Sequence, residues 1–289
     1  MDTALPSISP HELAAHIGRA DAPLLLDVRR NESFARSPFL IASARHCVPD
    51  DLGSWLQTQS PQPAVVYCVH GHDVSREATR RLRGAGWDAR FLAGGVEGGE
   101  DGVDDPQAIA AWRAVRLPLL RKRPDLGVTG EAPSRWITRE RPKIDRVACP
   151  WLVRRFVDPA AEFLYVPTDQ VFAEATRLHA VPYDIPGAPI SHEGERCSFD
   201  ALVAAFELQD PTLQALATIV RGADTDRLDL APQSAGLLAF SLGLSRLHGD
   251  DHALLAAALP LYDALYAWCR DAAGERHGWN PDLMTGAAR

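Results

Sequence analysis

Short apolar runs alternate with amphipathic stretches along the first 115 residues of the chain. Continuous apolar runs are typical of strands buried on both faces of a sheet, whereas apolar residues three or four apart predict helices. Ser9 and Pro10 favour the start of a helix, because serine can cap it and proline fits its first turn. The expected strands are residues 23–29, 44–48, 64–67 and 89–92, and the expected helices are one that follows Ser9 and residues 32–35, 50–57, 75–85 and 106–115. This order predicts an α/β fold with a mostly parallel sheet flanked by helices.

The pattern changes in the second half, where apolar residues recur mainly at helical spacing. The expected helices are residues 145–157, 170–180, 199–207, 211–222, 232–247 and 251–272, and the expected strands are 162–166 and 181–185. Pro150 removes a backbone donor from the first of these helices and should bend it or force the helix to restart. The aromatic residues Trp151, Tyr262, Tyr266 and Trp268 are expected in the core. The second half therefore predicts a mainly α-helical domain with a small β element.

Residues 117–133 separate the two patterns. They are rich in proline, glycine and basic residues and show no periodicity, as is typical of linkers. The basic triplet Arg121-Lys122-Arg123 is expected to be solvated there. Because 289 residues suit two domains better than one, we expect domains at residues 1–116 and 134–289.

Composition narrows the class of protein further. Hydrophobic content of 46% and charged content of 24% are those of an ordinary globular protein, and no apolar run approaches the roughly 20 residues that cross a bilayer. Residues 1–6 lack the basic start and apolar core of a secretory signal, so a cytoplasmic protein without a membrane partner is expected. A formal net charge of −8 argues against a general nucleic-acid surface, because phosphate binding requires a basic face.

Cys68 lies at the junction of an expected strand and an expected helix. The five cysteines, at positions 47, 68, 149, 197 and 269, contain no C-x-x-C pair, which fits a reducing compartment. A cysteine at such a junction receives loop N–H groups and the positive end of the helix dipole, and both favour the thiolate. The candidate loop continues through Val69, His70, Gly71, His72, Asp73, Val74, Ser75 and Arg76. A buried, inert cysteine is the alternative interpretation.

Three motifs in this half occur in the order of a known family. Asp27-Val28-Arg29 ends one strand, Tyr67-Cys68 ends another, and the run from Phe91 to Val96 reads Phe-Leu-Ala-Gly-Gly-Val. Over about residues 6–116 the chain resembles a single rhodanese domain, the sulfurtransferase fold. The resemblance implies that Cys68 carries a sulfane sulfur as a persulfide and passes it to a nucleophilic acceptor, with no cofactor required. Asp27 and Arg29 are expected to support the loop as an ion pair.

The loop also departs from the family pattern. The family places an arginine, which helps to hold anionic donors, where this sequence has Asp73. Thiosulfate is therefore a doubtful donor, and a persulfide, a thiol or another oxyanion remains open. His70 and His72 are candidates for adjusting the thiolate or relaying protons, with water-facing loop residues as the alternative.

The second half resembles another family. Residues 136–159, which begin Trp-Ile-Thr-Arg-Glu-Arg-Pro-Lys, resemble the start of the C-terminal domain of ChrB-type chromate-resistance proteins, and the resemblance extends over about residues 134–286. It implies a link to chromate resistance without defining a reaction.

Two segments of this half concentrate metal-ligating and basic residues. The candidate ligands of a transition metal such as Zn or Fe, or of an oxyanion such as chromate or sulfate, are Asp145, Arg146, Cys149, His192, Glu193, Cys197 and Asp224. Arginines suit oxyanions because the guanidinium fork matches their geometry. The alternatives are a solvated basic face that pairs with acidic residues, a hydrogen-bonded loop in which Ser198 caps a helix, and a turn at residues 221–226.

Two functions of different classes follow. In the first, the protein is a sulfurtransferase-like enzyme whose helical domain supplies the acceptor. In the second, it is a sensor or regulatory binding protein that recognises an oxyanion or metal, with the first domain as an accessory. The intact thiol loop favours the enzyme, and turnover distinguishes the two, because a sensor binds its ligand stoichiometrically.

Overall fold

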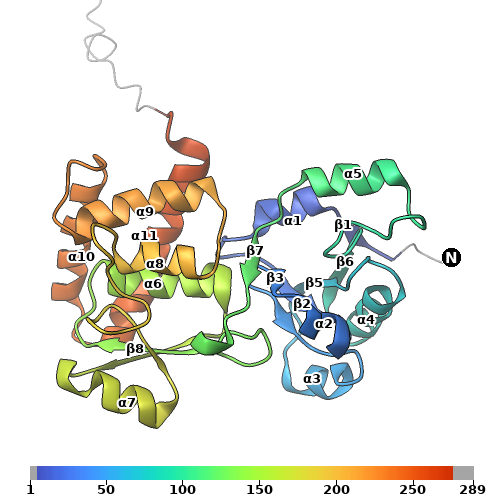
Figure 1. The fold of residues 1–289 in the computed structure, drawn as a ribbon, viewed down its shortest axis with the longest axis horizontal. Coiled ribbons are helices and arrows are strands. Elements are labelled where there is room, and N and C mark those ends of the chain that lie inside the picture. The colour runs from blue at the N-terminus through green and yellow to red at the C-terminus, as the bar shows by residue number, and fades with distance from the viewer. Residues whose placement is uncertain (1–4, 276–289) are drawn as a thin grey trace, which may run out of the picture.

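Five parallel strands form the sheet of the N-terminal domain in the computed structural model, which describes residues 5–275 (Figure 1). They are β1 (Ser7–Ile8), β2 (Leu24–Asp27), β4 (Arg45–His46), β5 (Pro63–Tyr67) and β6 (Asp88–Leu92). Their order in the sheet is β1-β6-β5-β2-β4, and every neighbouring pair is parallel. The predicted α/β fold with a parallel sheet is confirmed.

Helices cover both faces of this sheet. They are α1 (Pro10–His16), α2 (Asn31–Arg36), α3 (Leu52–Thr58), α4 (Asp73–Gly84) and α5 (Pro106–Ala114). Ser9 caps α1 in a capping box with Glu12, as its sequence indicates. Because side chains alternate along a strand, Val66 and Cys68 join the apolar cluster under α3 and α4, whereas Tyr67 joins the cluster on the opposite face.

The C-terminal domain is mainly helical, as predicted, but its small sheet has one strand more than expected. The sheet has the order β10-β8-β9, with β8 (Arg135–Arg139), β9 (Glu162–Val166) and β10 (Val181–Pro182) all parallel. The central strand β8 was not predicted, because its Arg-Trp-Ile-Thr-Arg sequence is charged at both ends and shows no alternation. Thr138 is nevertheless fully buried, and its hydroxyl donates to the carbonyl of Tyr183.

The first helix of this domain, α6 (Asp145–Leu152), contains Pro150 and continues as a π-helical turn at Val153–Val157. Since proline has no N–H group, the carbonyl of Arg146 lacks its usual partner four residues on. The hydroxyl of Tyr183 donates to that carbonyl at 3.3 Å. The proline is therefore accommodated without a break in the helix.

The remaining helices are α7 (Val171–Leu178), α8 (Ser198–Ala205), α9 (Pro211–Asp224), α10 (Ser234–Leu247) and α11 (Asp251–Ala267). The helix expected to end at residue 222 continues through Asp224, so the expected turn is confined to residues 225–226. Gly222 lies inside the helix where a Cβ atom would come within 2.3 Å of the Ser234 hydroxyl, so glycine permits close packing against α10. Among residues 5–275 no helix has the length and apolar character needed to cross a membrane.

The segment expected to be a solvated linker is packed. β7 (Leu119–Arg121) pairs antiparallel with β3 (Phe39–Ile41), as seen between the two domains in Figure 1. The ammonium group of Lys122 donates to the Phe34 carbonyl at 2.5 Å, and the guanidinium of Arg123 donates to the Ala205 carbonyl at 2.9 Å. The basic triplet therefore contacts both domains, contrary to the solvated interpretation. One apolar cluster also extends across both domains, and the ring of Phe156 packs against Gly18.

Candidate functional site

Cys68 follows the last residue of β5 and lies under the first turn of α4. Its side chain is 6% exposed, and its sulfur lies 3.2 Å from the hydroxyl of Ser75. The helix begins at Asp73, two residues before the expected start, so Asp73 and Ser75 both belong to its first turn. The thiol therefore lies between the carboxyl end of a parallel strand and the N-terminus of a 12-residue helix.

The loop after Cys68 packs directly against the backbone of residues 92–97. The carbonyls of Cys68 and Val69 accept hydrogen bonds from the N–H groups of Val96 and Glu97, each at 3.0 Å. Gly95 has φ +61°, and a Cβ atom there would come within 2.4 Å of the Val69 carbonyl oxygen. Only glycine fits this contact, which explains why a Gly-Gly pair accompanies the cysteine loop in the sequence.

The two loop histidines bind the turn at residues 99–104. Nδ1 of His70 lies 2.9 Å from the Gly99 carbonyl oxygen, and Nε2 of His72 lies 2.8 Å from a carboxylate oxygen of Asp104. The N–H of Glu100 and the ring of His72 together lower the pKa of the Asp104 carboxyl. These contacts hold the loop in place, and they leave Ser75 as the hydrogen-bonding partner of the thiol.

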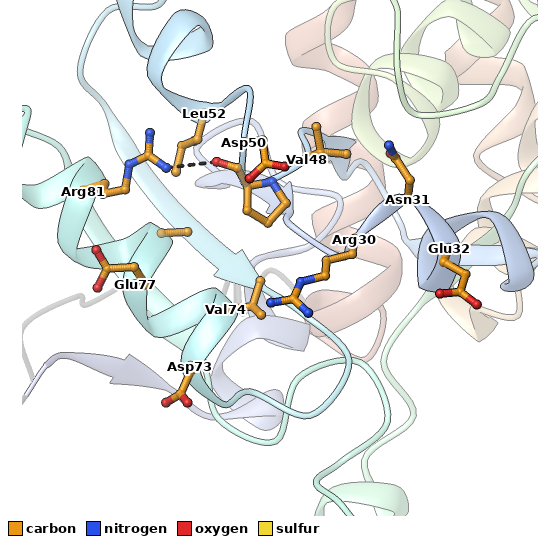
Figure 2. Close-up of a pocket in the computed structure, with 12 residues that line it drawn as sticks. Arg30, Asn31, Glu32, Val48, Asp50, Leu52, Asp73, Val74, Glu77 and Arg81 are labelled. Atoms are coloured by element: carbon orange, nitrogen blue, oxygen red, sulfur yellow. Dashed lines mark hydrogen bonds between the residues drawn. The ribbon is translucent and has the colours of Figure 1, made fainter.

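A cavity of about 510 Å³ adjoins the start of α4 (Figure 2). Its lining includes Asp73, Val74 and Ala78. Val74 and Ala78 pack in the same apolar cluster as Cys68, which does not itself line the cavity. Arg76 does not line the cavity, because its Nε donates to the Gly71 carbonyl and its guanidinium lies over the Phe91 ring.

Carboxylates outnumber cations around this cavity. Arg30 and Arg81 are its basic residues, and its acidic residues are Glu32, Asp50, Asp73 and Glu77. Arg81 extends from α4 and donates to the Pro49 carbonyl at 2.9 Å, whereas Arg30 extends toward Val74 (Figure 2). The local charge therefore disfavours a dianionic ligand.

Asp27 and Arg29 form a buried ion pair. Their side chains are 1% and 2% exposed, and Arg29 Nη2 lies 2.6 Å from Asp27 Oδ2. Arg29 also donates to the Phe39 carbonyl at 3.0 Å, and its guanidinium lies over the Phe34 ring. The pair connects β2 with the segment that follows α2.

Four side chains from separate segments of the C-terminal domain converge on one point. Nε2 of His192 lies 3.0 Å from Asp224 Oδ2, 3.4 Å from Asp184 Oδ1 and 3.6 Å from Asp145 Oδ2. The ligand atoms of Asp145, Asp184 and His192 all lie within 4.8 Å of one another. We call these four residues the acidic cluster.

Asp145 is the most deeply placed member of the acidic cluster. It is fully buried at the first position of α6, and its Oδ2 accepts from the N–H groups of Ser198 and Phe199. Its Oδ1 is buried without a hydrogen-bonding partner. Burial, with the neighbouring carboxylates of Asp224 and Asp184, raises the pKa of Asp145 well above its usual range. Burial and the Asp184 carboxylate likewise raise the pKa of Asp224.

The other predicted ligands of this domain lie around the acidic cluster. Cys149 and Cys197 are buried, and burial together with the Asp145 carboxylate raises the pKa of each thiol. Cys197, rather than Ser198, is the N-cap of α8, and its sulfur contacts Asp200 at 3.4 Å. Arg146 pairs with Asp184 at 3.3 Å. Glu193 is exposed in a β-bridge with Arg196, apart from the ligand group.

The basic stretch at residues 139–155 pairs with acidic residues, as the alternative interpretation expects, but several of its arginines are part-buried rather than solvated. Arg139 contacts Asp184 at 3.0 Å, and Arg155 contacts Asp263 at 2.8 Å. Arg141 donates to the carbonyl oxygens of Ser245 and His248.

Comparisons with known proteins assign both halves. Residues 9–101 match the model of the rhodanese-like domain, and residues 136–269 match the model of the ChrB C-terminal domain. The chain joins a rhodanese-like domain to a ChrB C-terminal domain. A curated relative, Protein ChrB of Cupriavidus metallidurans, is 34% identical over 150 residues, which are 48% of this chain and 45% of that protein. The chain thus matches less than half of the length of this relative.

Solved structures resemble the rhodanese-like domain. A rhodanese-related protein from Thermoplasma volcanium is 21% identical and covers 39% of this chain and 96% of its own, with a TM-score of 0.30. A rhodanese homolog from Thermus thermophilus is 25% identical and covers 32% of this chain and 98% of its own, with a TM-score of 0.27. The fold assignment rests instead on the family match and on the strand order of the sheet.

Asp184 of the ChrB domain was not among the predicted site residues, although the structure brings it to His192. It follows the short strand β10 and has φ +51°, a left-handed conformation that aspartate tolerates better than most residues. An acid within an expected strand is a weak signal, and nothing in the sequence relates it to His192.

Proposed function

We propose that Cys68 of the rhodanese-like domain accepts a sulfane sulfur as a persulfide and delivers it to a thiol acceptor. The observation that carries this proposal is the position of the thiol, between the end of β5 and the first turn of α4, 3.2 Å from the Ser75 hydroxyl. A helix N-terminus stabilises a thiolate and, after transfer, a persulfide anion. The match to the ChrB C-terminal domain and to Protein ChrB leads us to propose chromate resistance as the context of this chemistry.

The transfer consists of two displacements at sulfur. The Cys68 thiolate attacks the outer sulfur of a donor persulfide, an S–S bond forms to Cys68, and the donor leaves as a thiolate. An acceptor thiolate then attacks the outer sulfur of the Cys68 persulfide and regenerates the Cys68 thiolate. Each step forms one S–S bond and breaks one, so no external oxidant or reductant is needed.

The charge of the cavity beside α4 argues for a thiol persulfide as donor rather than thiosulfate. Four carboxylates and two guanidinium groups line the cavity, and the Arg81 guanidinium already donates to the Pro49 carbonyl. A dianion such as thiosulfate would therefore be repelled, whereas a persulfide of lower charge would not.

Exchange of Asp73 for arginine is expected to raise the kcat/KM for thiosulfate by about fivefold, which corresponds to about 1 kcal/mol for an exposed charge. Asp73 lines the cavity, so the change replaces a repulsive charge by an attractive one. Asp88→Arg is the matched control, since this exposed aspartate lies at the amino end of β6, opposite the start of β5 and far along the sheet from the end of β5 that precedes α4. Rapid wild-type turnover of thiosulfate that Asp73→Arg leaves unchanged would place Asp73 away from the bound donor.

The direct test of the proposed function is the intact mass of the full-length protein after incubation with a thiol persulfide. We expect a gain of one sulfur atom, followed by its loss when an acceptor thiol is added, with the acceptor persulfide as product. A protein that gains no sulfur, or that gains sulfur and never releases it to a thiol, would contradict the proposal.

A further inference from the structure

We propose that the acidic cluster of the ChrB domain, formed by Asp145, Asp184, His192 and Asp224, binds one divalent first-row transition-metal ion. The four residues come from the start of α6, the segment after β10, the loop before α8 and the last position of α9. Their carboxylate oxygens lie 3.0–3.6 Å from a single imidazole nitrogen. The proposal is independent of sulfur transfer at Cys68.

The unpartnered oxygen of Asp145 is the first observation that points to a ligand. Asp145 is 0% exposed, and its Oδ1 has no hydrogen-bonding partner although its Oδ2 has two. An unsatisfied buried carboxylate oxygen is costly, so proteins rarely retain one without a function. A metal ion bound between Asp145, Asp184 and His192 would supply the missing partner.

The charge balance is the second observation. The cluster contains three carboxylates, and the guanidinium groups within contact distance, those of Arg139 and Arg146, both lie on Asp184. Asp145 and Asp224 have no arginine or lysine partner among the described contacts, and His192 is the basic group that reaches them. A divalent cation bound among them would supply the positive charge that lets the three carboxyl groups be ionised side by side.

The donor set selects the class of metal. Carboxylates alone suit Mg²⁺, Ca²⁺ and Mn²⁺, whereas an added imidazole favours Zn²⁺, Fe²⁺ and Mn²⁺. The sulfur of Cys197 lies 3.4 Å from an Asp200 carboxylate oxygen, and neither Cys149 nor Cys197 belongs to the group of ligand atoms that lie within 4.8 Å of one another. The proposed ligands are therefore nitrogen and oxygen atoms, without the thiolates that the sequence suggested.

The cluster is accessible to ions and is largely formed in advance. The side chain of His192 is 41% exposed, whereas those of Asp145, Asp184 and Asp224 are 0%, 8% and 17% exposed. Asp184 is fixed by the Ser198 hydroxyl at 2.8 Å and Asp224 by the backbone N–H of Asp145 at 3.3 Å. An ion can therefore enter from the side of His192 and bind carboxylates that are already in place.

The experiment uses the full-length protein, treated with a chelator, dialysed and titrated with Zn²⁺, Mn²⁺ and Mg²⁺. We expect one Zn²⁺ or Mn²⁺ per chain, measured by metal analysis after dialysis, and a melting temperature raised by roughly 5 °C at a hundredfold excess over Kd. Mg²⁺ should bind at least tenfold more weakly.

Three variants assign the binding to the cluster. His192→Ala and Asp224→Asn should each weaken Zn²⁺ binding at least a hundredfold, whereas His252→Ala, which removes an exposed histidine of α11, should bind like the wild type. Asp224→Asn keeps the oxygen that accepts from Asp145 and removes a charge, so the metal-free variant should melt no lower than the metal-free wild type. Formation of the persulfide at Cys68 should be unchanged in all three.

Two outcomes would overturn the proposal. In the first, the wild type binds neither Zn²⁺ nor Mn²⁺ stoichiometrically, and its melting temperature does not change when either ion is added. In the second, it binds an ion that His192→Ala and Asp224→Asn retain with wild-type affinity, which would assign the ion to other residues. Neither outcome bears on sulfur transfer, because the Cys68 adduct is measured separately by mass.

Discussion

Cys68→Ser is expected to abolish the sulfur adduct completely. Serine keeps the size and the hydrogen bond to Ser75, but its hydroxyl is a far weaker nucleophile at neutral pH and does not form a persulfide. Intact mass after incubation with a thiol persulfide measures the change, and peptide mapping of the wild type should place the added sulfur on Cys68. Transfer to an acceptor thiol should fall to the uncatalysed rate.

Cys47→Ser is the matched control for this experiment. Cys47 packs in the same apolar cluster as Cys68 and is similarly buried, but burial and the nearby Asp51 carboxylate raise the pKa of its thiol to about 11. A thiol with this pKa stays protonated at neutral pH, so the control variant should form the adduct like the wild type. Sulfur that maps to Cys149 or Cys197, or that persists in Cys68→Ser, would contradict the assignment of the loop.

Asp27→Ala is expected to destabilise the protein by about 3–5 kcal/mol, the usual cost of removing one partner of a buried ion pair. The substitution would leave the Arg29 guanidinium, 2% exposed, without its carboxylate, and would also remove the acceptor of the Arg29 N–H. Urea unfolding followed by tryptophan fluorescence measures the change in free energy. The melting temperature should fall by roughly 10 °C.

Asp21→Ala tests whether burial causes this effect. Asp21 pairs with Arg19 two residues away, as Asp27 does with Arg29. Asp21 Oδ1 lies 2.8 Å from Arg19 Nε. The Arg19 and Asp21 side chains are 43% and 67% exposed, so loss of this pair should cost less than about 1 kcal/mol. Equal losses in the two variants would show that the buried pair contributes no more than the exposed one.

Local signals made the N-terminal domain predictable from sequence. Each strand of its sheet except the two-residue β1 overlaps one expected strand, and the capping box at Ser9 and Glu12 involves neighbours in the chain. β7 and β8 were not predicted, because each forms only by pairing with residues distant in the chain. β7 pairs with β3 across 80 residues, and β8 lies between two strands that follow it in the sequence. Basic residues in both segments suggested solvent exposure, although most of them have partners within the protein.

The two sites differ in the same way. Cys68 and its loop are contiguous, so the sequence identifies them directly. The acidic cluster depends on contacts between residues as far as 79 positions apart, as Asp145 is from Asp224. Three members of the acidic cluster, Asp145, His192 and Asp224, could be proposed from the sequence by their chemical type. Asp184 could not, because it joins the cluster only through the position of β10 in the fold. The thiols and Glu193 could be excluded only once the direction of each side chain was known.

The pairing of β7 with β3 limits how a sulfur atom could pass from one domain to the other. A flexible linker would let a carrier group swing between sites and raise its effective concentration at each. Here the connecting strand is hydrogen-bonded to the rhodanese-like domain, and its Arg121 N–H and Arg123 guanidinium bond to carbonyls of the ChrB domain. The connection is therefore part of the folded structure and does not act as a swinging arm. Sulfur released from Cys68 would have to leave on a diffusing thiol, and any communication with a metal bound in the ChrB domain would have to pass through the shared core.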